Sequence, residues 1–275
     1  MHPLLSALLK GILEGLTEFL PISSTGHLVL VRDLLPLTTD PADADRVNNL
    51  FDIVVQLPAV LAIVVLYRQR LWQAAQRVRS DAGAQRFWAG LFVAFLPIAI
   101  IGLALGEHIE ALLADEQFSC RVIAGALIVG GLILILVDRK SEAEPIRRAE
   151  DAPLSRALGI GLCQCLALIP GTSRSASTII GGRFLGLSRE AAAEYSFFLA
   201  IPVLGCAWGY KLVKDFEQIH WQTDGPLLLV GSIAAFVTAL LVVDLFIRFL
   251  QKHTLGAFGW YRIALGVLVL ILTSW

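Results

Sequence analysis

The chain has 275 residues, of which 56% are hydrophobic and only 16% are charged, whereas a soluble domain usually carries about 25% charged residues. This composition excludes a single water-soluble globule. The formal net charge of −1 argues against a nucleic-acid partner and against a basic helix lying on a membrane surface.

Apolar stretches recur along the chain, and several approach the roughly 20 residues that a helix needs to cross a bilayer. They are continuous and do not alternate with polar residues, which favours helices over a membrane barrel. The expected crossings are 50–67, 87–106, 118–137, 190–210, 226–247 and 256–273. The less regular stretches 4–31 and 155–187 are expected to form two broken, re-entrant segments. We therefore predict an all-α integral membrane protein with about six transmembrane helices.

The first stretch, 4–31, resembles a secretory signal only in its apolar character. It has no basic start, and Lys10, Glu14 and Glu18 interrupt the apolar run that a signal requires. We expect this stretch to belong to the mature protein.

The loops divide by charge into two sets. Twelve basic residues fall on one predicted side, namely Arg68, Arg70, Arg77, Arg79, Arg86, Arg139, Lys140, Arg147, Arg148, Arg156, Arg248 and Lys252. The loops 32–49, 107–117 and 211–224 carry four basic residues, Arg32, Arg46, Lys211 and Lys214, and many acids. The positive-inside rule places the first set in the cytoplasm, and the acidic loops and both termini outside.

The two broken segments resemble each other in sequence. Each has a short apolar helix, a proline (Pro21 or Pro170) and then a run of Ser, Thr and Gly. A later crossing in each half also contains a proline, Pro58 or Pro202. We predict one membrane domain, 1–275, built from inverted repeat halves of roughly 1–137 and 138–275. Interrupted helices at matching positions of two such halves point to a site near the bilayer midplane.

Glu14 and Glu18 are four residues apart, so a helix projects both carboxylates from one face. Their repulsion in a low-dielectric setting would be relieved by a shared divalent metal or by a proton on one of them. Hard oxygen ligands favour Mg²⁺ or Ca²⁺. The alternative is a water-facing helix with two solvated acids, which the apolar neighbours disfavour.

Hydroxyl groups and free amides follow Pro21, at Ser23, Ser24 and Thr25, just before the next apolar run. Amides at a helix start attract anions. His27 comes one turn later, where it could act as general acid, base or nucleophile, although a histidine in a membrane helix can also be a simple helix contact.

The second broken segment offers the same groups at Thr172, Ser173 and Ser175, and adds Arg174. A guanidinium matches a pair of phosphate oxygens, and within apolar helices it needs an anionic partner, either a ligand or the distant glutamates. If the two segments meet, carboxylates, histidine, serine and arginine share one pocket, which suits phosphoryl transfer.

Four other charged residues lie near the predicted ends of the crossings: Asp52, Glu194, Asp244 and Arg262. We interpret them as residues that reach the membrane surface or pair with one another.

Residues 14–27 (EGLTEFLPISSTGH) and 170–175 (PGTSRS) closely resemble the two signature motifs of bacterial undecaprenyl-diphosphate phosphatases, the bacitracin-resistance family. The resemblance covers essentially the whole chain. It implies a hydrolase that converts undecaprenyl diphosphate to undecaprenyl phosphate, recycles the lipid carrier for peptidoglycan synthesis and confers bacitracin resistance. It also implies a divalent cation and a multi-pass protein of the bacterial inner membrane, with its active site facing the periplasm.

Carried over position by position, the resemblance assigns the acidic, metal-binding pair to Glu14 and Glu18, and catalytic roles also to Ser24, His27 and Arg174. It gives substrate-binding roles to Ser23, Thr25, Thr172, Ser173 and Arg174. Ala176 departs from the family, which commonly has Gly there, but the change removes no functional group. Whether Ser24, His27 or water attacks stays open, as do the preferred metal and the oligomeric state, for which a homodimer is one candidate.

Inverted repeats with broken helices are also a transporter architecture. A secondary transporter or lipid flippase is therefore the alternative function, and such a protein should move its substrate without releasing phosphate.

Overall fold

The computed structural model describes residues 1–112, 115–139 and 145–273. Within these ranges every regular element is a helix, and the only β pairing is an isolated bridge between Ile146 and Leu187. The α-helices are α1 (Pro3–Thr17), α2 (Ser24–Val31), α3 (Ala44–Val54), α4 (Gln56–Leu66), α5 (Arg68–Arg77), α6 (Ala82–Leu112), α7 (Glu116–Asp138), α8 (Leu154–Gln164), α9 (Arg174–Phe184), α10 (Arg189–Asp215), α11 (Trp221–Leu250) and α12 (Gly256–Thr273). Three short 3₁₀ turns join them: η1 (Ala149–Asp151), η2 (Cys165–Leu168) and η3 (Phe216–Gln218). The all-α prediction is confirmed.

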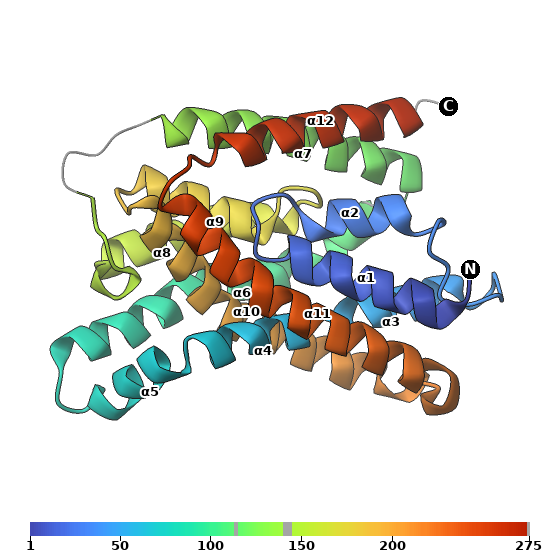
Figure 1. Cartoon of the computed structure of the whole chain (residues 1–275), viewed down its shortest axis with the longest axis horizontal. Helices are drawn as coiled ribbons and strands as arrows, with labels where there is room; N and C mark the ends of the chain where they lie inside the picture. The colour runs from blue at the N-terminus through green and yellow to red at the C-terminus, as the bar shows by residue number, and fades with distance from the viewer. Residues whose placement is uncertain (113–114, 140–144, 274–275) are drawn as a thin grey trace.

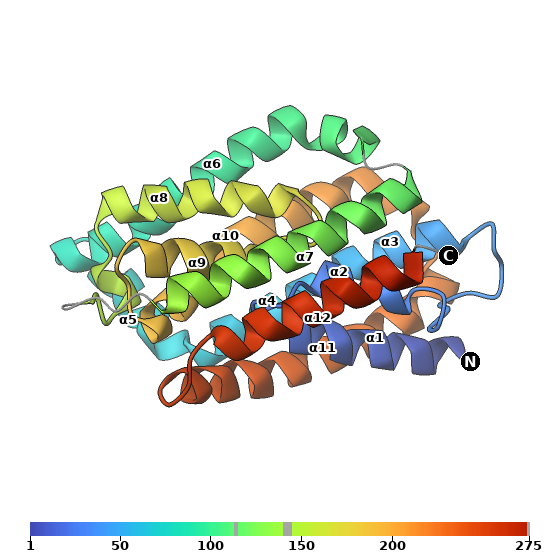
Figure 2. The same ribbon diagram turned by 90° about the horizontal axis from the view of Figure 1, so that it is seen from above.

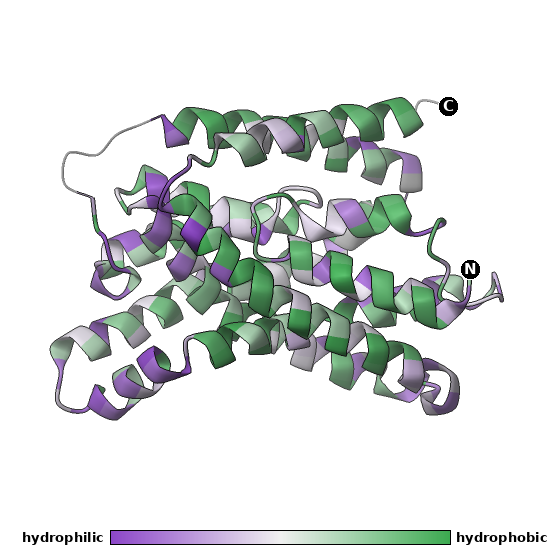
Figure 3. Cartoon of the chain, viewed as in Figure 1, coloured by the Kyte–Doolittle hydropathy of each residue, from purple (hydrophilic) through white to green (hydrophobic). Residues whose placement is uncertain are grey.

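Five helical stretches of the described chain are long and apolar enough to cross a membrane: Ala44–Leu66, Ala82–Gly106, Gln117–Asp138, Arg189–Lys214 and Trp221–Leu250. The sixth expected crossing forms α12, a shorter apolar helix. Large apolar side chains such as Leu103 and Leu136 are exposed on the outside of the bundle, as suits a protein whose solvent is lipid. Figure 3 shows the apolar residues along the middle of the helices and the hydrophilic ones mostly toward the two ends.

The two sets of loops lie at opposite ends of the bundle. Figure 1 shows α5 and the turn from α11 to α12 at one end, and the start of α1 with the end of α12 at the other. Arg46, near the start of α3, donates to the carbonyl oxygen of Gln218 beyond the end of α10 at 2.9 Å. Arg70, after α4, forms an ion pair at 2.6 Å with Glu194 near the start of α10. The α3–α4 crossing and α10 therefore run in opposite directions, as the charge pattern predicts.

Both broken segments have the same local geometry. Ser23 and Ser173 have φ of 74° and 73°, and each caps the helix that follows by accepting a hydrogen bond from an amide three residues later. Figure 2 shows α1 and α8 approaching the centre of the molecule from opposite ends. These features are expected of inverted repeats; the division into halves near residue 137 stays a prediction.

Close helix contacts hold the first broken segment in place. A side chain on Gly15 would meet the carbonyl oxygen of Ala235 in α11 at 2.5 Å, and one on Gly11 would collide with the backbone of Gly231. Small residues at a four-residue spacing let membrane helices approach in this way. The helix α1 can therefore lie against the backbone of α11.

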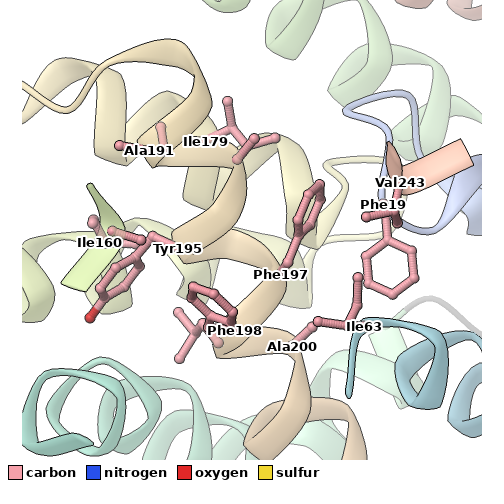
Figure 4. Close-up of a cluster of buried hydrophobic side chains, with 14 of the residues drawn as sticks. Phe19, Ile63, Ile160, Ile179, Ala191, Tyr195, Phe197, Phe198, Ala200 and Val243 are labelled. Atoms are coloured by element: carbon pink, nitrogen blue, oxygen red, sulfur yellow. The ribbon is translucent and has the colours of Figure 1, made fainter. Parts of the chain in front are cut away.

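The largest apolar core surrounds the first half of α10, as Figure 4 shows. The rings of Phe19 and Phe197 meet edge to face at 5.6 Å between centroids, a contact that contributes about 0.5–1.5 kcal/mol beyond its buried area. Phe19 follows Glu18, and Phe197 follows Ser196. Packing of these two rings therefore brings the chain just after α1 against the first half of α10.

Candidate active site

Glu14 and Glu18 lie at the end of α1, where the helix stops before Pro21. Both side chains are buried, Glu14 completely and Glu18 with 7% of its surface exposed. The alternative of two solvated, water-facing acids is thus excluded. The two carboxylates differ in their surroundings. Both oxygens of Glu18 accept hydrogen bonds, whereas both oxygens of Glu14 lie buried without a hydrogen-bond partner.

Glu18 joins the two broken segments. Its Oε1 accepts a hydrogen bond from Arg174 Nη2 at 2.9 Å, and its Oε2 accepts one from Ser24 Oγ at 2.8 Å. Arg174 begins α9 and Ser24 begins α2, so both groups stand at helix starts. The structure therefore brings two of the predicted catalytic residues, Ser24 from the first broken segment and Arg174 from the second, onto the carboxylate of a third, Glu18.

Ser196 of α10, which lies outside both motifs, accepts hydrogen bonds from Arg174. Arg174 Nη1 donates to the main-chain oxygen of Ser196 at 2.9 Å and to its Oγ at 3.3 Å, and Thr178 donates to the same Oγ at 2.7 Å. The guanidinium also lies 5.7 Å from the ring centre of Phe19. Ser196 stands alone in an apolar span, so neither spacing nor composition indicates its role.

The predicted hydroxyl groups divide between capping and the cavity. Ser23 and Ser173 serve as helix caps, and Ser173 Oγ also lies 3.0 Å from Ser175 Oγ. Thr25 is exposed and Thr172 is half-buried.

Gly171, with φ of 84°, lies against the backbone of Ile123, where an added Cβ would come within 2.7 Å. Only glycine can adopt this left-handed conformation without strain and also fit against the Ile123 backbone.

His27 lies behind the first broken loop, and both of its ring nitrogens have partners. Nδ1 lies 2.7 Å from the carbonyl oxygen of Ser23, and Nε2 lies 2.6 Å from the hydroxyl of Tyr261 in α12. Because a carbonyl oxygen can only accept, the network assigns the proton to Nδ1, so that Nε2 accepts from Tyr261. His27 thus supports the loop that carries Ser24, while Ser24 itself donates to Glu18.

A cavity of about 810 Å³ opens beside the start of α2. Ser24 and Thr25 line it together with polar side chains of α3 and the start of α4 and basic side chains from the last turns of α10, namely Asn49, Asp52, Gln56, Lys211 and Lys214. Its rim therefore belongs to the end of the bundle where both α1 begins and α10 ends. The cavity offers hydroxyl groups on one wall and positive charge on another, as an anionic headgroup requires.

A divalent cation fits Glu14 better than Glu18. The two unpaired, buried oxygens of Glu14 lack the positive partner that a buried carboxylate needs, whereas both oxygens of Glu18 are engaged. In the ranges that the structure describes, no group of three His, Cys, Asp or Glu side chains is placed to hold a metal ion. A cation at Glu14 would therefore complete its shell with water or ligand oxygens, as Mg²⁺ commonly does.

The four charged residues near the predicted ends of the crossings do not pair with one another in the described structure. Glu194 pairs with Arg70, and the half-exposed Asp244 pairs with Arg248. The interpretation of Arg262 is wrong, because this residue does not reach the surface and pairs with no acid among the described residues: it is fully buried and donates to main-chain carbonyl oxygens. Asp52 Oδ1 is buried without a hydrogen-bond partner.

Known proteins match the chain over nearly its full length. A family model described as bacitracin resistance protein BacA matches residues 7–268. A protein of Nitrosospira multiformis is 47% identical over 268 residues, covering 98% of this chain and 94% of its own. A protein of Dechloromonas aromatica is 47% identical, covering 97% and 93%, and one of Aromatoleum aromaticum is 45% identical, covering 96% and 92%. All three are named undecaprenyl-diphosphatase.

Proposed function

The chain belongs to the bacitracin resistance protein BacA family, and we infer from this membership and from its buried site that it is an undecaprenyl-diphosphate phosphatase. It hydrolyses undecaprenyl diphosphate to undecaprenyl phosphate and inorganic phosphate, which recycles the lipid carrier for peptidoglycan synthesis and gives bacitracin resistance. The observation that carries this function is the meeting of Ser24 and Arg174 on the carboxylate of Glu18, because this arrangement joins a nucleophile, its base and an anion-binding group.

For the reaction itself we propose that Arg174 and the amides at the starts of α2 and α9 bind the diphosphate. Ser24 Oγ attacks the terminal phosphorus and gives its proton to Glu18, to which it already donates a hydrogen bond. The bond between the terminal phosphorus and the bridging oxygen breaks, and undecaprenyl phosphate leaves. Water then attacks the phosphoserine, releases inorganic phosphate and restores the serine hydroxyl.

In this proposal Arg174 has two roles. In the free enzyme it neutralises Glu18 inside the protein, and with substrate bound its fork of donors can also reach phosphate oxygens. His27 acts by holding the carbonyl of Ser23, next to the nucleophile, instead of receiving the serine proton. Direct attack by water is the competing route, with Glu18 as its base.

We propose Mg²⁺ or Ca²⁺ as the cofactor, held by Glu14 with the help of substrate oxygens. When bound, the cation would neutralise negative charge on the diphosphate. The unpaired oxygens of Glu14 support this assignment. We further propose that the protein lies in the bacterial inner membrane with the cavity rim at the periplasmic side, because the basic loops gather at the other end.

The decisive experiment measures phosphate release from undecaprenyl diphosphate by the purified full-length chain in detergent, with Mg²⁺, with Ca²⁺ and with chelator. Arg174→Ala should abolish release, while Arg248→Ala should not, because that arginine is exposed at the opposite end of the bundle. A folded wild-type protein that releases no phosphate but moves the lipid between leaflets would favour the transporter instead.

A further inference from the structure

Arg262 of α12 is a fully buried cation whose hydrogen bonds in the described structure all end on main-chain carbonyl oxygens. A buried charge without an acidic partner is costly unless dipoles surround it. The chain provides room for this group, because an added Cβ at Gly130 of α7 would collide with the guanidinium. Such an arrangement calls for a role that a neutral side chain could not fill.

The carbonyl groups around Arg262 come from both broken segments. Nη1 donates to Pro21 at 3.3 Å, in the first loop, and Nη2 donates to Gly171 at 3.1 Å and Thr172 at 3.0 Å, in the second. Further bonds reach Ala126 and Leu127 in α7. One side chain thus links the two loops that carry the catalytic groups to each other and to a long membrane helix.

These contacts fall next to strained backbone. Ser23 and Ser173 both have positive φ, a conformation that persists in a non-glycine residue only when its surroundings enforce it. Arg262 holds the carbonyl directly before Ser173 and one two residues before Ser23. Because the peptide group is planar and trans, turning the Thr172 carbonyl toward Arg262 turns the Ser173 amide away from it.

The preceding residue on α12 contacts the same site. The hydroxyl of Tyr261 lies 2.6 Å from His27 Nε2, and the two rings stack with 5.6 Å between their centres. Two consecutive residues of α12 therefore hold the histidine of the first motif and the main chain of both motifs. Neither residue is part of the motifs themselves.

We propose that Tyr261 and Arg262 are positioning residues for the reaction. Arg262 keeps the two broken segments in register, so that Ser24 and Arg174 meet at Glu18, and Tyr261 sets the ring orientation and protonated nitrogen of His27. The inference rests on the proposed function, and it adds α12 to the parts of the chain on which turnover depends.

The first test compares Arg262→Met with Arg262→Lys. Methionine fills the space without donors, whereas lysine keeps the charge and can donate to some of the carbonyl groups. For Arg262→Met, kcat should fall about 10²-fold, the loss expected when reacting groups shift by roughly 1 Å, and binding of inorganic diphosphate, measured by calorimetry, should weaken. Arg262→Lys should recover part of both. Trp260→Phe, an exposed neighbour, should leave both unchanged.

The second test uses Tyr261→Phe, which keeps the stacked ring but removes the hydroxyl. We expect kcat to fall while KM stays unchanged, since His27 is placed to support the reacting loop and does not line the cavity. A role confined to packing would lower the melting temperature of the variant without this split between kcat and KM.

The outcomes separate the inference from the function on which it rests. If the wild-type chain releases no phosphate from undecaprenyl diphosphate, the proposed function fails. If the wild type is active and Arg262→Met matches it in kcat and in diphosphate binding, the function stands and the positioning role of Arg262 is refuted.

Discussion

At the scale of single residues, Glu18 accepts hydrogen bonds from Arg174 and Ser24 with its two oxygens, while Glu14, one turn earlier, has neither partner. The two carboxylates can therefore have different roles. Glu18, with its two hydrogen bonds, suits proton transfer and positioning, and Glu14, which has no partner, suits cation binding. This difference arises from the partners of Glu18, one of them 156 residues away along the chain, and not from the spacing of the two glutamates.

Glu18→Gln keeps the shape of the side chain but removes its charge. Phosphate release should fall by about 10²–10⁴-fold, the range for loss of a general base, and Arg174 would lose its ionic partner. The exposed Glu217→Gln is the matched control and should behave as wild type. Melting curves of both variants would show whether the protein stays folded, and a Glu18→Gln enzyme with wild-type turnover would rule out this residue as the base.

Ser24→Ala tests the nucleophile. If Ser24 attacks, the variant should lose nearly all turnover, and acid-quenched wild-type enzyme should contain phosphoserine at this position by mass spectrometry. Ser80→Ala, exposed in the loop after α5, should keep full activity. Normal turnover by Ser24→Ala would instead assign the attack to water.

Glu14→Gln tests the cation. Chelator should stop phosphate release by the wild type, and added Mg²⁺ or Ca²⁺ should restore it. In Glu14→Gln the concentration of metal needed for half-maximal rate should rise, because one anionic ligand is gone. Glu217→Gln again serves as control. An unchanged metal titration in Glu14→Gln would place the cation elsewhere.

At the scale of elements, the site depends on how closely α1 lies against α11. Some glycines of the chain make contacts and others do not: Gly15 faces the backbone of α11, whereas Gly205 in α10 has open space where a Cβ would stand. The sequence pattern treats these positions alike, since each belongs to a pair of glycines four residues apart. Only the packing distinguishes them.

Gly15→Ala should destabilise the protein by about 1–3 kcal/mol, the usual cost of overpacking, because its Cβ would lie 2.5 Å from a carbonyl oxygen and 2.8 Å from the side chain of Thr238. Gly205→Ala should be neutral or stabilise the helix by up to about 1 kcal/mol. Thermal unfolding in detergent measures both. Equal melting temperatures would show that α1 can move away from α11 without loss.

At the scale of the whole molecule, the charge asymmetry between the two ends predicts the orientation in the membrane. In a cysteine-free background, made by replacing Cys120, Cys163, Cys165 and Cys206, single cysteines can be placed at the exposed positions Glu217 and Arg79. An impermeant maleimide should label Glu217→Cys in intact spheroplasts, and Arg79→Cys only after lysis. The reverse pattern would place the cavity rim in the cytoplasm.

The sequence by itself determined the fold class and the motif residues. Apolar runs of membrane length leave helices as the main solution, since every backbone group must find its partner within the segment. The broken segments were visible as Pro21 and Pro170 followed by polar residues, and the charged loops predicted which ends lie together. The glutamates, Ser24 and Arg174 were identified by spacing and by resemblance to known motifs.

Only the tertiary structure decided which of these residues meet. Ser196, Tyr261 and Arg262 carry no signal in the sequence, because a lone serine, tyrosine or arginine in an apolar helix can equally face lipid, a neighbouring helix or the surface. For this reason the sequence pattern alone predicts a surface position or an acidic partner for Arg262, and that prediction is wrong. Its partners are main-chain carbonyl oxygens, which every residue possesses, and only the packing of α12 beside both broken segments brings those oxygens to it.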